Sequence, residues 1–464
     1  MSEKKLGLPA LTALVLSSML GAGVFSLPQN MAAVAGPAAL LAGWLITGVG
    51  ILFLAVAMLL LSRLRPDLDG GIFTYAREGF GEVTGFCSAW GYWLCAVIAN
   101  VSYLVIVFSA LSFFTDSPGH TFFGSGNTWP AIAGASFLLW LVHFLVLRGV
   151  QTAAMINILA TLGKLLPLCL FMVVALLAFR FANFSDDFRG LTLGHPLWYQ
   201  IKQTMLITLW VFIGVEGAIV ISARARQRRD VGRATLTAVL AALVVYLLVT
   251  LLSLGIVPRE QLAGMHNPSM AGLLEGIIGP WGKVVIVGGL ILSVSGAYLS
   301  WTIMAAEIPF LAAKTDAFPR IICRQNRHDA PAASLWLTNG SVQLCLLIIG
   351  ITHADYDNLL SIASEMVLVP YLLVGLFLMK TANQKFSKEM MTGAGASLYG
   401  LWLLYASGPE NLIMSLMLYA PGLLLFMVAR ATAPQPLPLT GKESVMIVII
   451  LLAAVTTGIR LMLT

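Results

Sequence analysis

The sequence has little charge and few cysteines. Lys, Arg, Asp and Glu make up 10% of its 464 residues, whereas roughly a quarter of the residues in soluble globular proteins are charged. The five cysteines are odd in number, scattered, and without the spacing of a metal site, so we expect no disulfide framework. No polar stretch is long enough to be a soluble domain, which favours a single membrane domain.

Enzyme signatures are missing as well. The chain has no phosphate-binding Walker sequence, no zinc-site spacing and no nucleophile elbow. Its six histidines do not cluster along the sequence. We therefore expect neither an enzyme nor a bound cofactor or metal. The formal net charge of +6 would suggest nucleic-acid binding in a soluble protein, but here the positions of the charges matter more than their sum, and no nucleic-acid partner is expected.

The sequence is rich in long apolar segments. Hydrophobic residues make up 59% of the chain and the mean hydropathy is +0.89. A helix needs about 20 mostly apolar residues to cross a bilayer. Such segments predict an all-α, multi-pass membrane protein with twelve spans and one more at the C-terminus: 8–34, 38–61, 83–114, 130–147, 154–179, 203–222, 233–256, 283–312, 335–353, 358–380, 393–407, 411–430 and 444–463.

The basic residues alternate between the loops of this scheme. If the N-terminus is cytoplasmic, the loops and span ends on that side hold 20 of the 27 Lys and Arg residues and those on the opposite side hold 6; the remaining one, Lys164, lies well inside a span. Cytoplasmic loops of membrane proteins carry such an excess. We therefore expect a bacterial inner (cytoplasmic) membrane protein in the lipid bilayer, with its N-terminus in the cytoplasm.

Two spans are interrupted by glycine near the middle of the bilayer. The first contains Gly21-Ala22-Gly23, and in the sixth Gly214 and Gly217 flank Glu216. Glycine costs roughly 1 kcal/mol against alanine inside a helix, and one such segment alone could equally be a close-packing contact. Interruptions at matching positions of two halves are instead typical of a transporter binding site.

This pairing predicts the organisation of the chain. Five spans in each half mean that the second half enters the membrane from the opposite side, so the repeats are inverted. We expect a transporter core at 1–430, with repeats at 8–179 and 203–380 and helices 11 and 12 at 393–430. A cytoplasmic linker and the thirteenth helix then occupy 431–464. Backbone N–H groups freed at a break inside lipid need a cavity or ligand to satisfy them, and a helix N-terminus suits a carboxylate.

Ionisable residues inside spans are functional candidates by default. Lys164 in span five is expensive to bury unless it is paired, contacts carbonyl oxygens or loses its proton. It is a candidate for a fixed positive charge where related folds hold sodium, although a structural ion pair would also explain it. Glu216 could attract a cationic substrate or take up a proton as the site empties, or it could cap the broken helix. Glu307 and Glu365 are weaker candidates of the same kind.

Three further side chains lie at similar depth. Trp210 and Trp301 could stack on a guanidinium or ammonium group, an interaction of about 1–2 kcal/mol when desolvated, or they could simply fill helix interfaces. Asn100 in span three could bind a ligand or a neighbouring helix.

Taken together, these motifs resemble the basic amino acid/polyamine antiporters of the amino acid–polyamine–organocation superfamily. The resemblance covers spans one to twelve and lies in MLGAGVFSLP (19–28), ANVSY (99–103), LWVFIGVEGA (209–218), DAFPRI (316–321) after the tryptophan-containing span eight, and LVPY (368–371). Within that group the chain looks most like the arginine/ornithine antiporters. The resemblance implies the LeuT-like fold of inverted five-helix repeats with discontinuous helices 1 and 6, no cofactor, and compatibility with a homodimer.

The resemblance also implies a substrate site. Backbone around Met19, Ala22 and Gly23 would meet the substrate carboxylate, Trp301 would stack on a guanidinium, and Trp210 would close the pocket. Glu216 would be the gate and the proton-linked carboxylate, while Lys164 matches the span-five lysine of sodium-independent relatives. The rest of the implied lining consists of Asn100, Ile213 and Ser361, with Cys95, Ala96 and Tyr103 nearby. Arginine/agmatine exchangers have serine where this chain has Ala22, so one hydroxyl contact to the carboxylate is absent.

The expected function is sodium-independent exchange of cationic amino acids by alternating access, with arginine and ornithine as the first pair to test. Lysine/cadaverine, histidine/histamine and arginine/agmatine exchange remain open within the same class. A proton-translocating subunit of a respiratory complex is the alternative from another class, because it too has many spans with buried Lys and Glu. A receptor or a structural membrane protein is a third, which the paired breaks disfavour.

Overall fold

The computed structural model describes residues 7–68, 71–148, 153–216, 228–328, 330–382, 384, 387–432 and 439–463. The described part is helical and contains no β-strand. Its first half comprises α1 (Leu8–Met19), α2 (Gly23–Val34), α3 (Pro37–Leu64), α4 (Ile72–Phe80), α5 (Glu82–Thr115), α6 (Trp129–Leu147), α7 (Ala153–Ala178), α8 (Phe181–Asp186), η1 (Leu191–Leu193) and α9 (Leu197–Phe212). Its second half comprises α11 (Arg228–Ile256), α12 (Arg259–Ala263), α13 (Ser269–Ile278), α14 (Pro280–Lys314), η3 (Arg320–Cys323), α15 (Ala332–Thr352), α16 (Tyr356–Thr381), α17 (Lys388–Ser407), α18 (Pro409–Ala431) and α19 (Gly441–Leu463).

These helices follow the predicted spans closely. Within the described residues, nine helices are long and apolar enough to cross a membrane, and ten if α1 and α2 count as one broken span. The count of twelve plus one stays a prediction, as do the proposed repeat boundaries. The short helices α4, α8, α12 and α13 lie in segments between the predicted spans, where the sequence pattern gave no helix.

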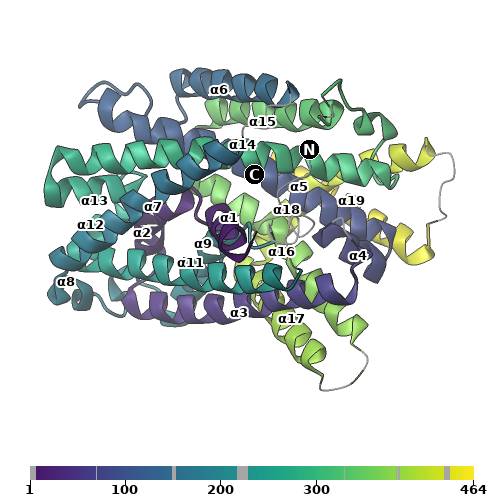
Figure 1. Ribbon diagram of the computed structural model, residues 1–464, viewed down its shortest axis with the longest axis horizontal. Coiled ribbons are helices and arrows are strands. Elements are labelled where there is room, and N and C mark those ends of the chain that lie inside the picture. Colours follow the sequence, from purple (N-terminus) through teal and green to yellow (C-terminus); the bar gives the residue numbers. More distant parts are fainter. Residues whose placement is uncertain are drawn as a thin grey trace.

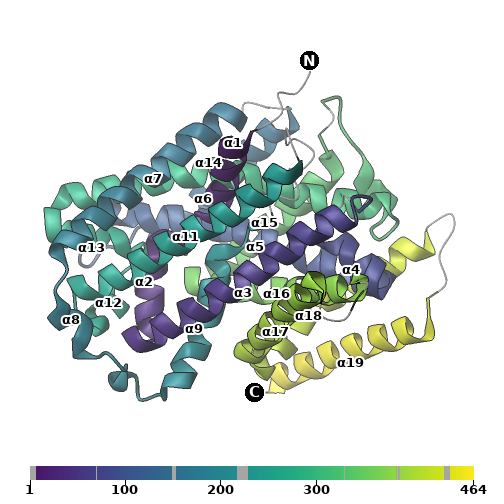
Figure 2. The ribbon, with the colours of Figure 1, turned by 60° about the horizontal axis from the view of Figure 1, so that its bottom comes forward.

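α5 is the central helix and α19 the most peripheral of the apolar helices. In its most apolar stretch, 89% of the α5 residues are buried inside the protein, against 22% for α19. α5 packs against α14 and α16, and when the molecule is viewed down its shortest axis α1, α2 and α9 lie within the bundle rather than at its rim (Figure 1). α19 packs along α18 and forms an outer edge (Figure 2, yellow). The breaks of the chain therefore lie in its interior.

Polar side chains inside the apolar helices join one helix to the next. The hydroxyl groups of Thr47 in α3 and Thr208 in α9 lie 2.7 Å apart, and the indole N–H of Trp44 in α3 donates to Thr250 in α11 at 2.9 Å. A polar group in lipid must find such a partner within the protein. These bonds hold α3 against the helices that follow the first repeat and help to fix the end of α9 beside the break of the first span.

Candidate functional site

The first predicted break is present in the structure. α1 ends at Met19, α2 begins at Gly23, and the two helices are bent by 43°. No side chain caps α2. The N–H of Phe25 donates to the Ala22 carbonyl oxygen at 3.1 Å, and the N–H groups of Gly23 and Val24 receive no side-chain cap of the kind that often satisfies a helix N-terminus. A Cβ atom at Gly21 would lie 2.8 Å from the hydroxyl oxygen of Tyr103, and one at Gly23 would lie 2.9 Å from the indole nitrogen of Trp210. The glycines therefore let two aromatic side chains reach the break.

The second break begins where the sequence placed it. α9 ends at Phe212, Ile213 has extended backbone angles, and Gly214 has a φ of +110° that favours glycine. The side-chain hydroxyl of Ser18 lies 2.7 Å from the Val15 carbonyl oxygen and 3.0 Å from the Gly214 carbonyl oxygen, which share its one proton. The contact with Gly214 connects the two breaks. Gly217 and the residues after it in the predicted sixth span lie outside the described residues.

Tyr246 of α11 makes a second link between the breaks. Its hydroxyl oxygen lies 2.8 Å from the carbonyl oxygen of Met19 and 2.6 Å from that of Val211. Both carbonyls are near a helix end, where the intrahelical partner is missing. Because a phenol has one proton, the two carbonyls share it. The sequence analysis did not single out Tyr246 or Ser18, since a tyrosine and a serine in apolar spans carry no pattern of their own.

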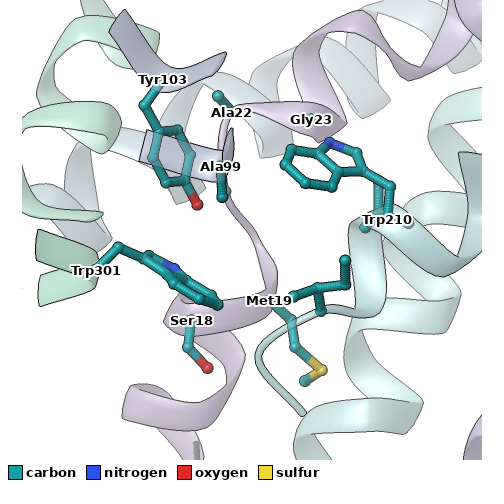
Figure 3. A pocket seen from close by; sticks show the side chains of 11 residues that line it. Ser18, Met19, Ala22, Gly23, Ala99, Tyr103, Trp210 and Trp301 are labelled. Carbon is teal, nitrogen blue, oxygen red and sulfur yellow. The ribbon is translucent and has the colours of Figure 1, made fainter. Parts of the chain in front are cut away.

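A small pocket lies between the two breaks (Figure 3). Tyr103, Trp210 and Trp301 point toward the same space from three different helices, and the broken first span passes between them. The lining consists of Ser18, Met19, Gly21, Ala22, Gly23, Ala99, Tyr103, Trp210, Val211, Ile213 and Trp301. Seven of these were predicted as site residues, and Gly21 was predicted as part of the first break, whereas Ser18, Ala99 and Val211 were not singled out from the sequence.

Four sequence-derived candidates do not line the pocket in this conformation. Cys95 and Ala96 are fully buried in α5, about one helix turn before the lining residue Ala99. Ser361 donates to the backbone carbonyl of Asp357 in its own helix. Asn100 is fully buried, and neither its amide nitrogen nor its amide oxygen has a hydrogen-bond partner. Burying both groups unpaired is costly. Of the four residues, Asn100 is therefore the one whose side chain needs a hydrogen-bond partner, from a ligand or from another helix.

An aromatic pair contacts the pocket at one end. The indole N–H of Trp210 donates to the hydroxyl oxygen of Tyr356 at 2.9 Å, and the two rings meet edge to face with centroids 6.5 Å apart. Tyr356 is the first residue of α16. This hydrogen bond holds the tryptophan across the pocket, against the N-terminus of α2.

A buried carboxylate lies beyond the second break. Glu216 is 2% exposed and accepts hydrogen bonds from the hydroxyl groups of Tyr92 and Tyr371, both at 2.7 Å, and from the backbone N–H of Gly214 at 3.2 Å. Three donors satisfy the carboxylate without a cation. Tyr371 lies fifteen residues after Tyr356 in α16, which corresponds to ~22 Å along a helix. The Glu216 cluster and the Trp210–Tyr356 pair are therefore separate contacts along the same helix.

Lys164 of α7 is 1% exposed and donates from its ammonium nitrogen to the backbone oxygen of Ser17 at 2.8 Å and to the Ser17 hydroxyl at 2.9 Å. Ser17 lies in the last turn of α1, the end of a helix that attracts positive charge. Among the described residues, no carboxylate lies within ion-pair distance of Lys164. The contact is thus between an ammonium group and one carbonyl and one hydroxyl oxygen, rather than the structural ion pair that the sequence left open.

The two remaining carboxylate candidates lie away from the pocket lining. Glu365 of α16 accepts a hydrogen bond from Ser415 of α18 at 2.8 Å, and Glu307 lies in the second half of α14. In the described part of the chain, His, Cys, Asp and Glu residues nowhere gather in threes as metal ligands would.

Comparison with known proteins places these features in context. A family model described as "Amino acid permease" matches residues 6–455. The chain is 69% identical to a protein of Escherichia coli strain K12 named "Putative arginine/ornithine antiporter", over 98% of each chain. It is 43% identical to the "Arginine/ornithine antiporter" of Pseudomonas aeruginosa, over 98% of this chain and 97% of that one. It is also 43% identical to the "Arginine/agmatine antiporter" of Chlamydia pneumoniae, over 91% of this chain and 89% of that one.

A solved structure shares the fold. The crystal structure of MhsT in complex with L-phenylalanine matches with a TM-score of 0.59 and 14% sequence identity, over 85% of this chain and 98% of that one. At this identity the match concerns the fold alone. It confirms the predicted LeuT-like class of all-α membrane protein.

Proposed function

Because the chain belongs to the amino acid permease family, we propose that it exchanges cationic amino acids across the membrane, with arginine entering and ornithine leaving as the pair. The proposal draws on relatives that are named arginine/ornithine and arginine/agmatine antiporters. It is not an enzyme; its work is to bind one solute at a time and to change the side from which the pocket is open.

The observation that carries the proposal is the pocket between the two breaks. Its walls combine the uncapped N-terminus of α2 with the indole faces of Trp210 and Trp301 (Figure 3). The free N–H groups and the positive end of the helix dipole suit a substrate carboxylate. An indole face suits a guanidinium or ammonium group. An amino acid with a cationic side chain has both groups.

The unpaired amide of Asn100 fits the same substrate. A guanidinium has five N–H donors and no acceptor, so it needs oxygen atoms around it. The Asn100 side chain is fully buried and its oxygen is unoccupied. We expect the side chain of arginine to reach past Ala99 toward Asn100 once the substrate is bound, and Cys95, Ala96 and Ser361 to join the lining in that state.

Two gates would control access to this pocket. Trp210, held by Tyr356, is the gate on the side of the α15–α16 loop. Glu216, held by Tyr92 and Tyr371, is the gate on the side where α5 begins. In alternating access each gate opens while the other stays closed. Glu216 would take up a proton, or meet the substrate cation, when its two phenol partners move away.

Lys164 would make the cycle independent of sodium. Its ammonium group already occupies the oxygen atoms at the end of α1, where a cation is needed to neutralise the exposed carbonyl groups. A covalently attached cation cannot leave with the substrate. It therefore fixes α1 without adding an ion to the transport stoichiometry.

The membrane setting follows from the charge pattern. With 20 of 27 basic residues on one side, we propose the bacterial inner membrane, with the N-terminus in the cytoplasm. The Glu216 gate then faces the cytoplasm and the Trp210–Tyr356 gate faces outward. A homodimer in the bilayer stays a prediction.

The test is exchange in proteoliposomes. Vesicles are loaded with unlabelled ornithine, agmatine, lysine, cadaverine, histidine, histamine or nothing, and uptake of labelled arginine is measured in sodium-free buffer. We expect fast uptake with internal ornithine and almost none into empty vesicles. Uptake into empty vesicles at the same rate would contradict exchange, and uptake that requires sodium would contradict the role of Lys164.

Charge movement separates the two pairs named among the relatives. Arginine and ornithine are both monocations near neutral pH, so one-for-one exchange moves no net charge. Agmatine is a dication, so exchange for arginine moves one charge. An imposed potassium diffusion potential should leave arginine/ornithine exchange unchanged, and a strong voltage effect with internal ornithine would overturn the one-for-one scheme.

A further inference from the structure

The thirteenth predicted helix, α19, packs along α18 and also contacts α5. Much of α19 is peripheral: Val448, Leu452 and Val455 are 53–59% exposed, whereas Ile447 is buried. At its start, however, the Glu443 side chain reaches the beginning of α5. α5 carries Tyr92, Asn100 and Tyr103, so this contact connects a helix outside the twelve-span core to a wall of the pocket.

Glu443 caps two helices at once. One of its oxygens, Oε1, accepts the backbone N–H groups of Glu82 at 2.9 Å and Val83 at 3.3 Å, the first two residues of α5. The other, Oε2, accepts the backbone N–H and the hydroxyl of Thr440, both at 2.9 Å, while the N–H of Glu443 donates to the Thr440 hydroxyl at 3.3 Å. The second set is the capping box of α19 itself.

α5 cannot supply this cap from its own sequence. The residue before it is Gly81, which has no side chain to cap with and a φ of +99°. A Cβ atom at Gly81 would lie 2.8 Å from Oε1 of Glu443. The position is therefore both conformationally suited to glycine and spatially filled by the carboxylate from α19. A negative charge at the N-terminus of α5 also interacts favourably with the positive end of the helix dipole.

The capped end is close to the inner gate. Tyr92 lies ten residues after Glu82, ~15 Å along α5, and its hydroxyl donates to Glu216. The side chain of Glu82 is itself held by Arg77 of α4, with the Arg77 Nε atom 2.9 Å from Glu82 Oε1. Arg77 fixes the side chain of this residue and Glu443 fixes its backbone, so both the register and the tilt of the α5 start are determined.

We propose that Glu443 is a positioning residue for the inner gate. By capping α5 from α19, it holds α5 in the position at which Tyr92 closes on Glu216. The thirteenth helix thereby acts as a brace that sets how readily the pocket opens toward the side of the α5 start. This inference rests on the proposed function, because it gives the Tyr92–Glu216 contact the role of a gate.

The test reads the gate through a natural cysteine. Cys95 is fully buried and lies one turn after Tyr92 in α5, whereas Cys323 in η3 is partly exposed and lies outside the predicted spans. The purified full-length protein is treated with N-ethylmaleimide without substrate, and modification at each cysteine is followed by peptide mass spectrometry. Labelling of Cys323 serves as the internal reference. We expect Glu443→Ala to raise the labelling rate of Cys95 about fivefold, the size of effect expected from losing one helix cap.

Two matched variants separate the cap on α5 from the cap on α19. Thr440→Ala breaks the capping box of α19 but leaves the Glu443 carboxylate in place for α5. Glu389→Ala removes a carboxylate from the first turn of α17, a helix that packs mainly against α16 and α3. We expect both to label Cys95 at the wild-type rate. A Cys95 rate that stays at the wild-type value in folded Glu443→Ala, or rises equally in Thr440→Ala, overturns the proposal.

A milder variant covers the case in which Glu443→Ala does not fold. Glu443→Gln keeps one acceptor oxygen of the two, so we expect it to raise Cys95 labelling by less than Glu443→Ala. If only this variant is monodisperse and its Cys95 labels at the wild-type rate, the proposal fails. The assay needs no substrate, so its result can be read even if wild-type proteoliposomes show no exchange, which would instead refute the proposed function.

Discussion

The ammonium nitrogen of Lys164 lies 2.8 Å from the backbone carbonyl oxygen of Ser17, one helix turn before the first break. The next two residues of α1 are held by other elements: Ser18 donates to Gly214 of the sixth span, and the Met19 carbonyl accepts from Tyr246 of α11. Three successive residues at the end of α1 are thus attached to three different segments. If α1 moves, either these hydrogen bonds break or the segments bonded to it move with it.

The first prediction concerns this lysine. Lys164→Met keeps the apolar stem and removes the ammonium group that donates to the two Ser17 oxygens, so exchange should slow roughly tenfold or more, as expected when a buried, hydrogen-bonded charge is removed. The measurement is the initial rate of labelled arginine uptake into ornithine-loaded vesicles. Lys202→Met, at a partly exposed lysine of α9, is the matched control. Wild-type rates with unchanged pH dependence in Lys164→Met would count against the role.

The second prediction concerns the Glu216 gate. Each phenol donates a charge-assisted hydrogen bond to the carboxylate, and such bonds contribute about 1.5–3 kcal/mol. Tyr92→Phe and Tyr371→Phe should each leave the inner gate less firmly closed and raise Cys95 labelling by about tenfold. Since both phenols hold the same carboxylate, the double variant should exceed either single one by less than the product of the two effects. Multiplying effects would mean that the two tyrosines act independently.

A third prediction tests the close approach at the first break. Gly23→Ala would place a methyl group 2.9 Å from the indole nitrogen of Trp210, so it should displace Trp210 from Tyr356 and lower exchange roughly tenfold or more, as small misplacements in a binding site do. Gly288→Ala in α14, where a Cβ atom meets nothing within 4 Å, is the matched control and should retain wild-type exchange. Equal activity of the two variants would show that the tryptophan does not need this space.

The sequence predicted features that depend on local composition. Apolar length located the spans, and glycine marked the break after Met19 and the end of α9 at Phe212, because both signals act within a few residues of the structure that they specify. Trp210, Trp301 and Glu216 stood out because polar or large aromatic residues at mid-membrane depth are uncommon. Their individual roles in binding stay predictions.

Contacts between segments that are far apart in the chain could not be predicted from the sequence. Tyr246 is 227 residues from Met19, and Glu443 is 361 residues from Glu82. A tyrosine in an apolar helix and a glutamate in a helix first turn are both common, so neither residue type indicates its partner. The partners of these two side chains are set by the packing of α11 against α1 and of the α19 start against α5.

The last prediction concerns stability on the face opposite the α5 start. Arg259 of α12 is 7% exposed and donates to the carboxylate of Asp187 at 2.8 Å and to the backbone oxygen of Ala32 in α2 at 2.9 Å. Burial alone would raise the pKa of Asp187, but hydrogen bonds from Thr192 and Arg259 outweigh it and hold the pKa below the ordinary value of 3.8. Of the two carboxylates that the described residues place near the guanidinium, Asp187→Asn removes the closer and less exposed one and leaves Glu260, 3.9 Å away and 71% exposed. It should lower the melting temperature, by analogy with buried pairs whose loss costs about 3–5 kcal/mol.

The pH dependence of that loss has a definite sign. A carboxyl group whose folded pKa is depressed stabilises the protein above its unfolded pKa and loses this contribution as pH falls through the folded value. The difference in melting temperature between wild type and Asp187→Asn should therefore be full at neutral pH and shrink only below about pH 4. Asp186→Asn, at the exposed neighbouring carboxylate, should melt like wild type at every pH. A difference that instead shrank between neutral pH and pH ~5, above the ordinary carboxyl range, would mean that a group other than Asp187 holds Arg259 and, through it, the end of α2.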